Sequence, residues 1–285
     1  MLEKNENFCY FDAHFHLADC IRDSRVKHGN DTIDAFSLSG LTRQSAWYAC
    51  ACSHSIEEWE ITERFITALQ KGQEPLTTQL CLSYGLHPQS AGYINIEQNA
   101  DFLEGLLSQH KLCAIGETGF DFFTDEFKVA ALLQERIFNI QLELALQYKL
   151  PLVVHSRKST DKLFEYSKQL KKLPAVLFHS FMGAPVQAKS LLDHGINAYF
   201  SFGKQVMNNN KKVIACVREL PAKVLLTETD APFQFLKGET HTEPWEIKKI
   251  FSAFCELRNE NELELARILK TNFYNLFMQN SNINW

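Results

Sequence analysis

The chain has 285 residues, of which 45% are hydrophobic and 22% are charged, and its net charge is −5. This composition excludes a disordered, collagen-like or fibrous protein as a description of the whole chain. No apolar run approaches the roughly 18 residues that a membrane span requires, and no secretory signal is recognisable near residue 1. We therefore expect a globular cytoplasmic protein without a membrane partner, whose eight cysteines are reduced and mostly buried.

Short apolar runs alternate with helical periodicities along the chain. The predicted strands are residues 8–13, 46–52, 79–85, 112–116, 152–155, 175–179, 198–202 and 224–228. Helices are predicted at residues 55–71, 95–110, 125–148, 160–171, 185–194, 210–219, 244–257 and 262–278, with a weak helical signal at 21–44. In the helix at 125–148, spacings of four, three and four predict one buried stripe through Leu133, Ile137, Ile140 and Leu144.

Eight strand–helix pairs in a chain of this length predict a single (β/α)8 TIM barrel over residues 1–285. Several predicted strands are continuous apolar runs, which is typical of parallel strands that are covered on both faces. An open, doubly wound sheet is the alternative fold. It would need a phosphate-binding loop after the first strand, and the GxGxxG motif is absent.

Histidines and carboxylates follow the predicted strands at their C-terminal ends, which converge on one mouth of a barrel. They are His14, His16, Glu117, His155, His179 and Asp230. Each of them alone is more often a hydrogen-bonded structural residue, but four histidines and two carboxylates would be a costly way to build a core. Six ligand groups exceed the need of one tetrahedral ion and predict two divalent ions that share one carboxylate.

The motifs around these residues are FDAHFHLAD, GLHP, IGETGFDFF, VVHSR, FHSFMG and TETDAPF, in this order. Together they resemble the TatD family of metal-dependent hydrolases, the TatD-like DNases of the amidohydrolase superfamily. The resemblance implies a (β/α)8 barrel with two ions at its mouth and Glu117 as the bridge between them. The remaining ligands would be His14, His16 and Asp230 for one ion, and His155 and His179 for the other. The segment 20–45 is longer than is usual in the family, and residues 237–244 lack the Arg and the Asn-x-Pro that many members carry.

Two further residues are candidates for substrate binding. His87, in the GxHP motif after the third strand, is expected to contact a substrate oxyanion or phosphate, with a structural histidine as the alternative. Glu228 lies two residues before Asp230 and is assigned to the substrate, with a hydrogen bond to a ligand histidine or an extra weak ion as alternatives. Surface or helix positions are expected for the histidines away from the strand ends, which are His28, His54, His110, His194 and His241. Packing is the role expected for Cys50 and Cys52.

Two ions that share a hydroxide lower the pKa of the parent water, so that the hydroxide is available as a nucleophile at neutral pH. Asp230 would orient this hydroxide, accept its proton and deliver a proton to the leaving group, and Glu117 would act with it as the shared ligand. The mixed nitrogen and oxygen donors admit Zn²⁺, Mn²⁺ or Mg²⁺.

The resemblance favours a deoxyribonuclease that cleaves phosphodiester bonds, with DNA or a small phosphoester as the substrate. Hydrolysis of a small amide, ester or lactone on the same binuclear site is the first alternative. A non-catalytic metal-binding protein is the second, and the complete ligand set argues against it. We expect a monomer or a weak oligomer.

Overall fold

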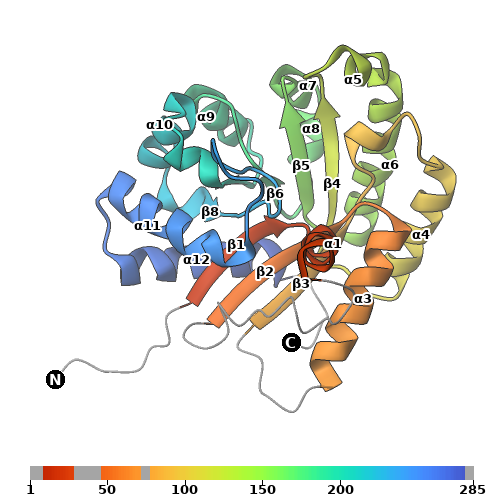
Figure 1. Ribbon diagram of the computed structural model, residues 1–285. Coiled ribbons are helices and arrows are strands. Elements are labelled where there is room, and N and C mark those ends of the chain that lie inside the picture. Colours follow the sequence, from red (N-terminus) through yellow and green to blue (C-terminus); the bar gives the residue numbers. More distant parts are fainter. Residues whose placement is uncertain (1–8, 29–45, 72–77, 280–285) are drawn as a thin grey trace.

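The computed structural model describes residues 9–28, 46–71 and 78–279, and this part of the chain forms one sheet of eight parallel strands. Neighbouring strands are hydrogen-bonded in chain order from β1 to β8 (Figure 1). The strands are β1 (Cys9–Phe15), β2 (Ala46–Ser53), β3 (Thr78–Tyr84), β4 (Ala114–Asp121), β5 (Leu152–Arg157), β6 (Val176–Phe178), β7 (Ala198–Phe202) and β8 (Leu225–Thr227). The predicted (β/α)8 barrel is confirmed.

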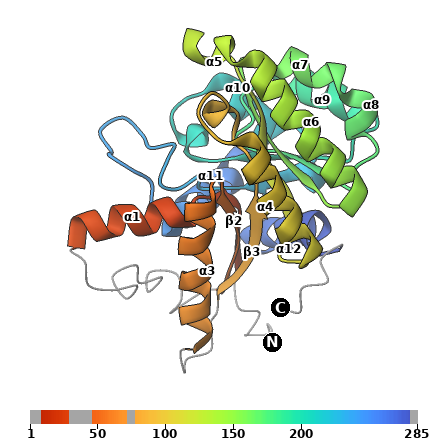
Figure 2. The same cartoon turned by 90° about the vertical axis from the view of Figure 1, so that its right-hand side faces the viewer.

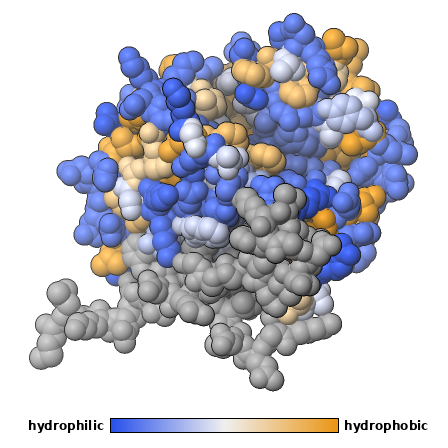
Figure 3. All heavy atoms as spheres, viewed as in Figure 1, coloured by the Kyte–Doolittle hydropathy of each residue, from blue (hydrophilic) through white to orange (hydrophobic). Residues whose placement is uncertain are grey.

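Helices surround the sheet on its outer side (Figures 1 and 2). They are α1 (Leu17–His28), α3 (Ile56–Lys71), α4 (Ile96–Ser108), α5 (Asp125–Val129), α6 (Ala131–Tyr148), α7 (Thr160–Glu165), α8 (Ser167–Leu170), α9 (Pro185–Asp193), α10 (Lys211–Glu219), α11 (Ile247–Arg258) and α12 (Glu262–Phe277). The 3-10 turns are η2 (Pro88–Ser90), η3 (Lys204–Met207), η4 (Ala222–Val224) and η5 (Pro244–Glu246). Hydrophilic side chains predominate on the face drawn in Figure 3. Within the described residues, no helix combines the length and the apolar character that crossing a membrane requires.

Three of the predicted helices differ from those observed. The helix predicted at 125–148 is divided at Ala130 into α5 and α6, and the helix at 160–171 is divided at Tyr166 into α7 and α8. The helix predicted at 244–257 begins with the 3-10 turn η5. No glycine or proline marks the two divisions, so sequence periodicity alone could not locate them. Most of the weak signal at 21–44, and most of the long segment 20–45, lies outside the described residues.

The buried face of α6 also differs from the predicted stripe. Leu133 is 38% exposed, whereas Gln134 and Gln141 are fully buried. The side-chain oxygen of Gln134 accepts the backbone N–H of Asp121 at 2.9 Å, and that of Gln141 accepts the backbone N–H of Leu86 at 2.9 Å. These glutamines face inward because they satisfy backbone groups at the end of β4 and after β3, which a hydropathy pattern cannot reveal.

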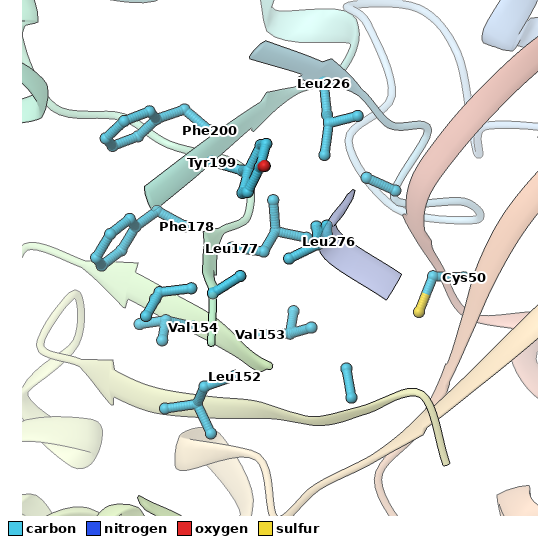
Figure 4. Packing of buried hydrophobic residues seen from close by; sticks show 14 of the residues in the cluster. Cys50, Leu152, Val153, Val154, Leu177, Phe178, Tyr199, Phe200, Leu226 and Leu276 are labelled. Carbon is cyan, nitrogen blue, oxygen red and sulfur yellow. The ribbon is translucent and has the colours of Figure 1, made fainter. Parts of the chain in front are cut away.

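Apolar side chains fill the interior of the barrel (Figure 4). Val153 of β5, Leu177 of β6 and Leu226 of β8 are fully buried in one cluster, and Leu276 of α12 belongs to the same cluster. Cys50 of β2 is buried there as well, as its predicted packing role requires. Burial of each large apolar side chain stabilises the fold by about 1.5–3 kcal/mol. Because the interior is packed, the space for chemistry is at the mouth.

Two irregularities of strand register lie where the strands carry predicted ligands. Between residues 12 and 15, β1 advances three residues while β2 advances two, and β4 does the same against β5 between residues 115 and 118. Such a bulge bends its strand and redirects a side chain. His14 lies in the first irregular segment and Glu117 in the second.

The first and last strands are joined by hydrogen bonds next to these ligands. The backbone N–H of Asp230 donates to the carbonyl of His14 at 2.9 Å, and that of His16 donates to the residue after Asp230 at 2.8 Å. The Asp12 carboxylate accepts both the backbone N–H and the hydroxyl of Thr229, at 2.9 and 2.7 Å. Residues more than 200 positions apart in the sequence are therefore held in one group.

Candidate metal centre

The structure brings the other five predicted ligands together around Glu117. This residue lies in β4 and is only 2% exposed. His14 lies in β1 and His155 in β5, and His16 and His179 directly follow β1 and β6. Asp230 lies three residues after the end of β8. Side chains from four separate strand ends thus converge on one carboxylate, as expected at the C-terminal mouth of a barrel.

One oxygen of Glu117 faces the ligands of β1 and of the loop after β8. Glu117 Oε2 lies 3.2 Å from His14 Nε2 and 4.0 Å from His16 Nε2. Asp230 Oδ1 lies 3.1 Å from His16 Nε2 and 3.7 Å from His14 Nε2. The two Nε2 atoms are 3.3 Å apart. These four residues form the group that we call the first ligand group.

The other oxygen of Glu117 faces histidines from the opposite side of the mouth. Glu117 Oε1 lies 2.5 Å from His155 Nδ1, 2.6 Å from His179 Nε2 and 3.1 Å from His87 Nε2. We call His155, His179 and Glu117 the second ligand group. The shared carboxylate therefore connects two sets of donors, one at each of its oxygens.

The spacing of these donors fits a divalent ion. Two ligands of one ion with bonds near 2.0–2.2 Å are separated by about 3.0–3.5 Å when they lie at neighbouring positions. Most separations in the first ligand group fall near this range, between 3.1 and 3.7 Å. Two imidazole nitrogens that face each other beside two carboxylates are arranged as ligands around a cation, so the residues present fit a metal.

Comparison with known proteins connects this geometry to a family. Residues 11–278 match the family model described as TatD related DNase. The chain belongs to this family. It is 32% identical over 217 residues to the uncharacterized metal-dependent hydrolase YjjV of Escherichia coli, with 74% of this chain and 80% of that protein covered. The family is one of metal-dependent hydrolases, and this chain is a TatD-family hydrolase acting on ester bonds.

Two further similarities refine the comparison. The 3′-5′ ssDNA/RNA exonuclease TatD of Cronobacter sakazakii is 29% identical over 206 residues, which cover 69% of this chain and 76% of that protein. The crystal structure of the TatD homologue YjjV from Escherichia coli superimposes with a TM-score of 0.74 at 25% identity, covering 94% of this chain and 97% of that one. The similarity thus extends from the motifs to the whole fold.

His54 is a residue of this TatD-family site that the sequence pattern missed. We expected a surface or helix position, but His54 directly follows β2 and its side chain is 17% exposed. Its Nε2 lies 3.3 Å from Glu117 Oε2. The predicted strand ended at Cys52, one residue before the observed end, so the rule that selected the other strand-end histidines passed over this one. His110 and His194 are exposed as predicted, and His241 lies 2.6 Å from Glu243.

Asp121 is a second residue that the pattern missed. Its Oδ2 accepts from His155 Nε2 at 3.2 Å and from the Gln89 side chain at 2.7 Å, while its Oδ1 accepts the backbone N–H of Phe123 at 2.8 Å. A carboxylate that holds one ring nitrogen of a histidine fixes which nitrogen faces the metal site. The predicted strand ended at residue 116, whereas β4 continues to Asp121, so the sequence pattern did not mark Asp121 as a strand-end residue.

His87 lies at the edge of the second ligand group as a hydrogen-bond donor. Its Nδ1 accepts the backbone N–H of Gln89 at 3.2 Å, which requires an unprotonated Nδ1. The neutral ring therefore carries its hydrogen on Nε2, which donates to Glu117 Oε1. Burial lowers the pKa of His87 to about 3, so the ring is neutral at physiological pH.

Glu228 is fully buried behind the second ligand group. Its Oε2 accepts the hydroxyl hydrogen of Ser201 at 2.5 Å and lies 3.7 Å from His179 Nδ1. Its Oε1 accepts from the Gln234 side chain at 3.3 Å, and Gln234 also donates to Asp230 Oδ2 at 2.7 Å. Glu228 therefore lies next to the candidate ligand His179, and through Gln234 it is connected to the candidate ligand Asp230.

The histidines set the charge of the two acidic ligands. Burial alone would raise the pKa of Glu117, but the surrounding histidines, foremost His179, hold it well below its ordinary value. Burial likewise opposes ionisation of Asp230, and the hydrogen bond from His16 outweighs it and lowers the pKa. Both carboxylates are therefore anionic near neutral pH and available as ligands.

A cavity of about 480 Å³ lies over the ligands, within the size range of small-molecule sites. Its lining includes His87, Arg157, Met182 and Phe233. Phe233 is 46% exposed, and the Arg157 guanidinium lies 3.5 Å above the ring of Phe123, which is 44% exposed. The rim of the cavity thus presents aromatic surface and a cation next to a carboxylate-rich floor.

Proposed function

We propose that this TatD-family hydrolase uses two divalent ions to cleave phosphodiester bonds at the ends of single-stranded nucleic acid. The observation that carries the proposal is Glu117, whose two oxygens face separate sets of imidazole nitrogens. Relatives named 3′-5′ ssDNA/RNA exonuclease support nucleic acid as the substrate class. One chain supplies all six candidate ligands, so the proposed site does not require a residue from a second copy.

In this proposal His14, His16 and Asp230 of the first ligand group hold one ion, and His155 and His179 of the second ligand group hold the other. Glu117 is the shared ligand. When bound, the ions lower the pKa of water and stabilise negative charge on the phosphoryl oxygens. The donors admit Zn²⁺, Mn²⁺ or Mg²⁺, which all accept a mixture of imidazole and carboxylate ligands.

Asp230 is the proposed proton carrier. It borders the cavity, and its Oδ2 is oriented by the Gln234 side chain at 2.7 Å. Its lowered pKa keeps the carboxylate ionised, so it can accept the proton of the attacking water. It then returns this proton to the oxygen of the leaving group.

His87 and Glu228 have different proposed roles. His87 borders the cavity, and we propose that its neutral Nε2–H donates to a phosphate oxygen of the substrate in place of Glu117 Oε1. Glu228, for which the sequence left three roles open, is better placed to hold His179 than to touch substrate, because it is fully buried and its Oε2 lies 3.7 Å from His179 Nδ1. We propose this supporting role for Glu228.

The residues at the rim of the cavity favour single-stranded nucleic acid over a small ester as the substrate. The exposed ring of Phe233, which lines the cavity, provides a surface on which an unpaired base can stack. Arg157, which also lines the cavity, offers a cation for the phosphate backbone. Action on chain ends is supported by the relatives named 3′-5′ exonuclease.

The test combines metal content with turnover. Single-stranded DNA with Mg²⁺ or Mn²⁺ is compared with a panel of small esters, amides and lactones as substrates. Asp230→Asn should reduce DNA turnover on the order of 10²–10⁴-fold, the range lost with a general acid–base group. His87→Ala should retain both ions and mainly reduce kcat/KM. Turnover of the small substrates with none of DNA would refute the nuclease proposal, and an ion lost from His87→Ala would refute the assigned roles.

A further inference from the structure

The side chain of His54 completes a third nitrogen position around one oxygen of Glu117. Its Nε2 lies 3.3 Å from Glu117 Oε2, nearly the same distance as His14 Nε2 on the same oxygen, 3.2 Å. Ligand atoms of His16, His54 and Glu117 all lie within 4.8 Å of one another. The spacing therefore matches that of the ligands already assigned to the first ligand group.

The surrounding structure holds His54 in this position. Its backbone N–H donates to Glu58 Oε2 at 2.7 Å, and the backbone N–H of Glu58 donates to Ser55 Oγ at 3.2 Å. These bonds fix the start of α3 directly after β2. The imidazole lies between the rings of His16 and His87, with both ring centroids 4.8 Å away. His54 is thus placed by helix capping and by ring packing, and it also borders the cavity.

We propose that His54 is a further ligand of the ion held by His14, His16 and Asp230, and that it makes this position selective for Zn²⁺ over Mg²⁺. The inference rests on the proposed binuclear function and adds the identity of one ion to it. With His54, the first ligand group has three imidazole nitrogens, whereas the second has two. Imidazole suits Zn²⁺ and related transition metals, while Mg²⁺ prefers oxygen ligands and retains its water.

His87 illustrates why not every histidine at Glu117 is a ligand. The Nδ1 of His87 accepts a backbone N–H, so its Nε2 carries a hydrogen and has no lone pair for an ion. Nε2 of His54 faces Glu117 Oε2 and the Cys52 sulfur, at 3.3 and 3.4 Å. The Cys52 thiol donates its hydrogen to the carbonyl of Gly116, so this thiol hydrogen does not occupy the Nε2 lone pair of His54.

The experiment measures metal affinity directly. His54→Ala, the exposed-histidine control His194→Ala and wild type are titrated with Zn²⁺ and with Mg²⁺ in competition with a chelator. Cobalt-loaded protein provides a second readout, because visible absorption of Co²⁺ changes with ligand number. For His54→Ala we expect the Zn²⁺ affinity of one position to fall by about 10–100-fold. A loss of this size is typical when a residue that supports a metal ligand is removed. Mg²⁺ affinity should change little, so that the Zn²⁺/Mg²⁺ selectivity falls.

His16→Ala separates this inference from the proposed function. If His16→Ala loses an ion while His54→Ala keeps wild-type Zn²⁺ affinity and cobalt absorption, the binuclear site stands and the role of His54 is wrong. If wild type binds neither metal, the proposed function fails together with it. An increase of KM in His54→Ala with unchanged metal affinity would make His54 a substrate contact and overturn the inference. Thermal unfolding of each variant shows whether the compared proteins are folded.

Discussion

Replacing Asp121 by Asn should weaken one metal position without touching a ligand. The Asn side chain can keep the Oδ1 acceptor for the backbone N–H of Phe123, which Asp121 holds at 2.8 Å. It places an NH₂ group where Oδ2 accepts from His155 Nε2 at 3.2 Å and from the Gln89 side chain. Gln89 can turn its amide to present oxygen, but His155 can adapt only by moving its hydrogen to Nδ1.

This change of tautomer is the reason that the metal affinity should fall. Nδ1 is the His155 nitrogen that faces Glu117 Oε1, at 2.5 Å, so a hydrogen there removes the lone pair needed for an ion. Loss of such a supporting partner typically reduces metal affinity by about 10–100-fold, equivalent to about 1.4–2.8 kcal/mol. The loss should be confined to the ion of the second ligand group, because no hydrogen bond of Asp121 reaches the first group's histidines.

Chelator competition with Zn²⁺ on Asp121→Asn measures the two positions separately, and the exposed Asp193→Asn serves as the control. We expect one of the two binding steps to weaken and the other to match wild type. Equal affinities in wild type and Asp121→Asn would refute the argument that Asp121 selects the tautomer of His155. Weakening of both steps would show that the two ligand groups are not independent.

Further predictions concern pH and backbone geometry. Burial lowers the pKa of His87 to about 3, so this histidine is neutral at every pH above about 4. His87→Gln should therefore lower kcat/KM without changing the shape of the pH profile of kcat/KM between pH 5 and 9. A titration near pH 6.5 that is present in the wild-type profile and absent in the variant would contradict this. The folded-state pKa of Asp121 is lowered to about 2, chiefly by His155 against an opposing effect of burial, so its ionised form stabilises the protein above the unfolded pKa of about 3.9. In chelator-treated protein, the destabilisation caused by Asp121→Asn should shrink as the pH falls from about 5 towards 2, as urea unfolding would measure; a constant difference would argue against it. Gly119 has a φ of 143°, and a Cβ there would collide with the carbonyl oxygen of His155, so Gly119→Ala should cost on the order of 2–6 kcal/mol in unfolding free energy. Gly92→Ala, with nothing within 4 Å of its added Cβ, is the matched control, and equal unfolding free energies for the two variants would contradict the prediction.

The sequence predicts the barrel and the convergence of its ligands because both follow from local patterns. Each predicted ligand is next to a short apolar run, and the ends of parallel strands in a barrel meet at one mouth. His14 and His16, two positions apart, were expected on one face of a strand. Their Nε2 atoms lie 3.3 Å apart in the structure.

The remaining features depend on contacts between distant segments. The irregular register at residues 12–15 and 115–118 arises from pairing with neighbouring strands, and one sequence contains no sign of it. His54 was missed because its strand extends to Ser53, beyond the end that the apolar run indicated. Asp121 was missed because its partner His155 lies 34 residues away, on the next strand. Gln134 and Gln141 were missed for the same reason, since hydropathy takes no account of hydrogen bonds to the backbone.

The central claim is that Glu117 joins two ions whose combined action cleaves nucleic acid. The most direct measurement is the release of nucleotides from end-labelled single-stranded DNA as a function of bound metal per chain, for wild type and for Glu117→Gln. We expect wild-type turnover to rise as the metal content approaches two ions per chain, and Glu117→Gln to lose both metal and turnover while remaining folded. Full turnover in the presence of excess chelator, or normal metal content and turnover in Glu117→Gln, would contradict the account.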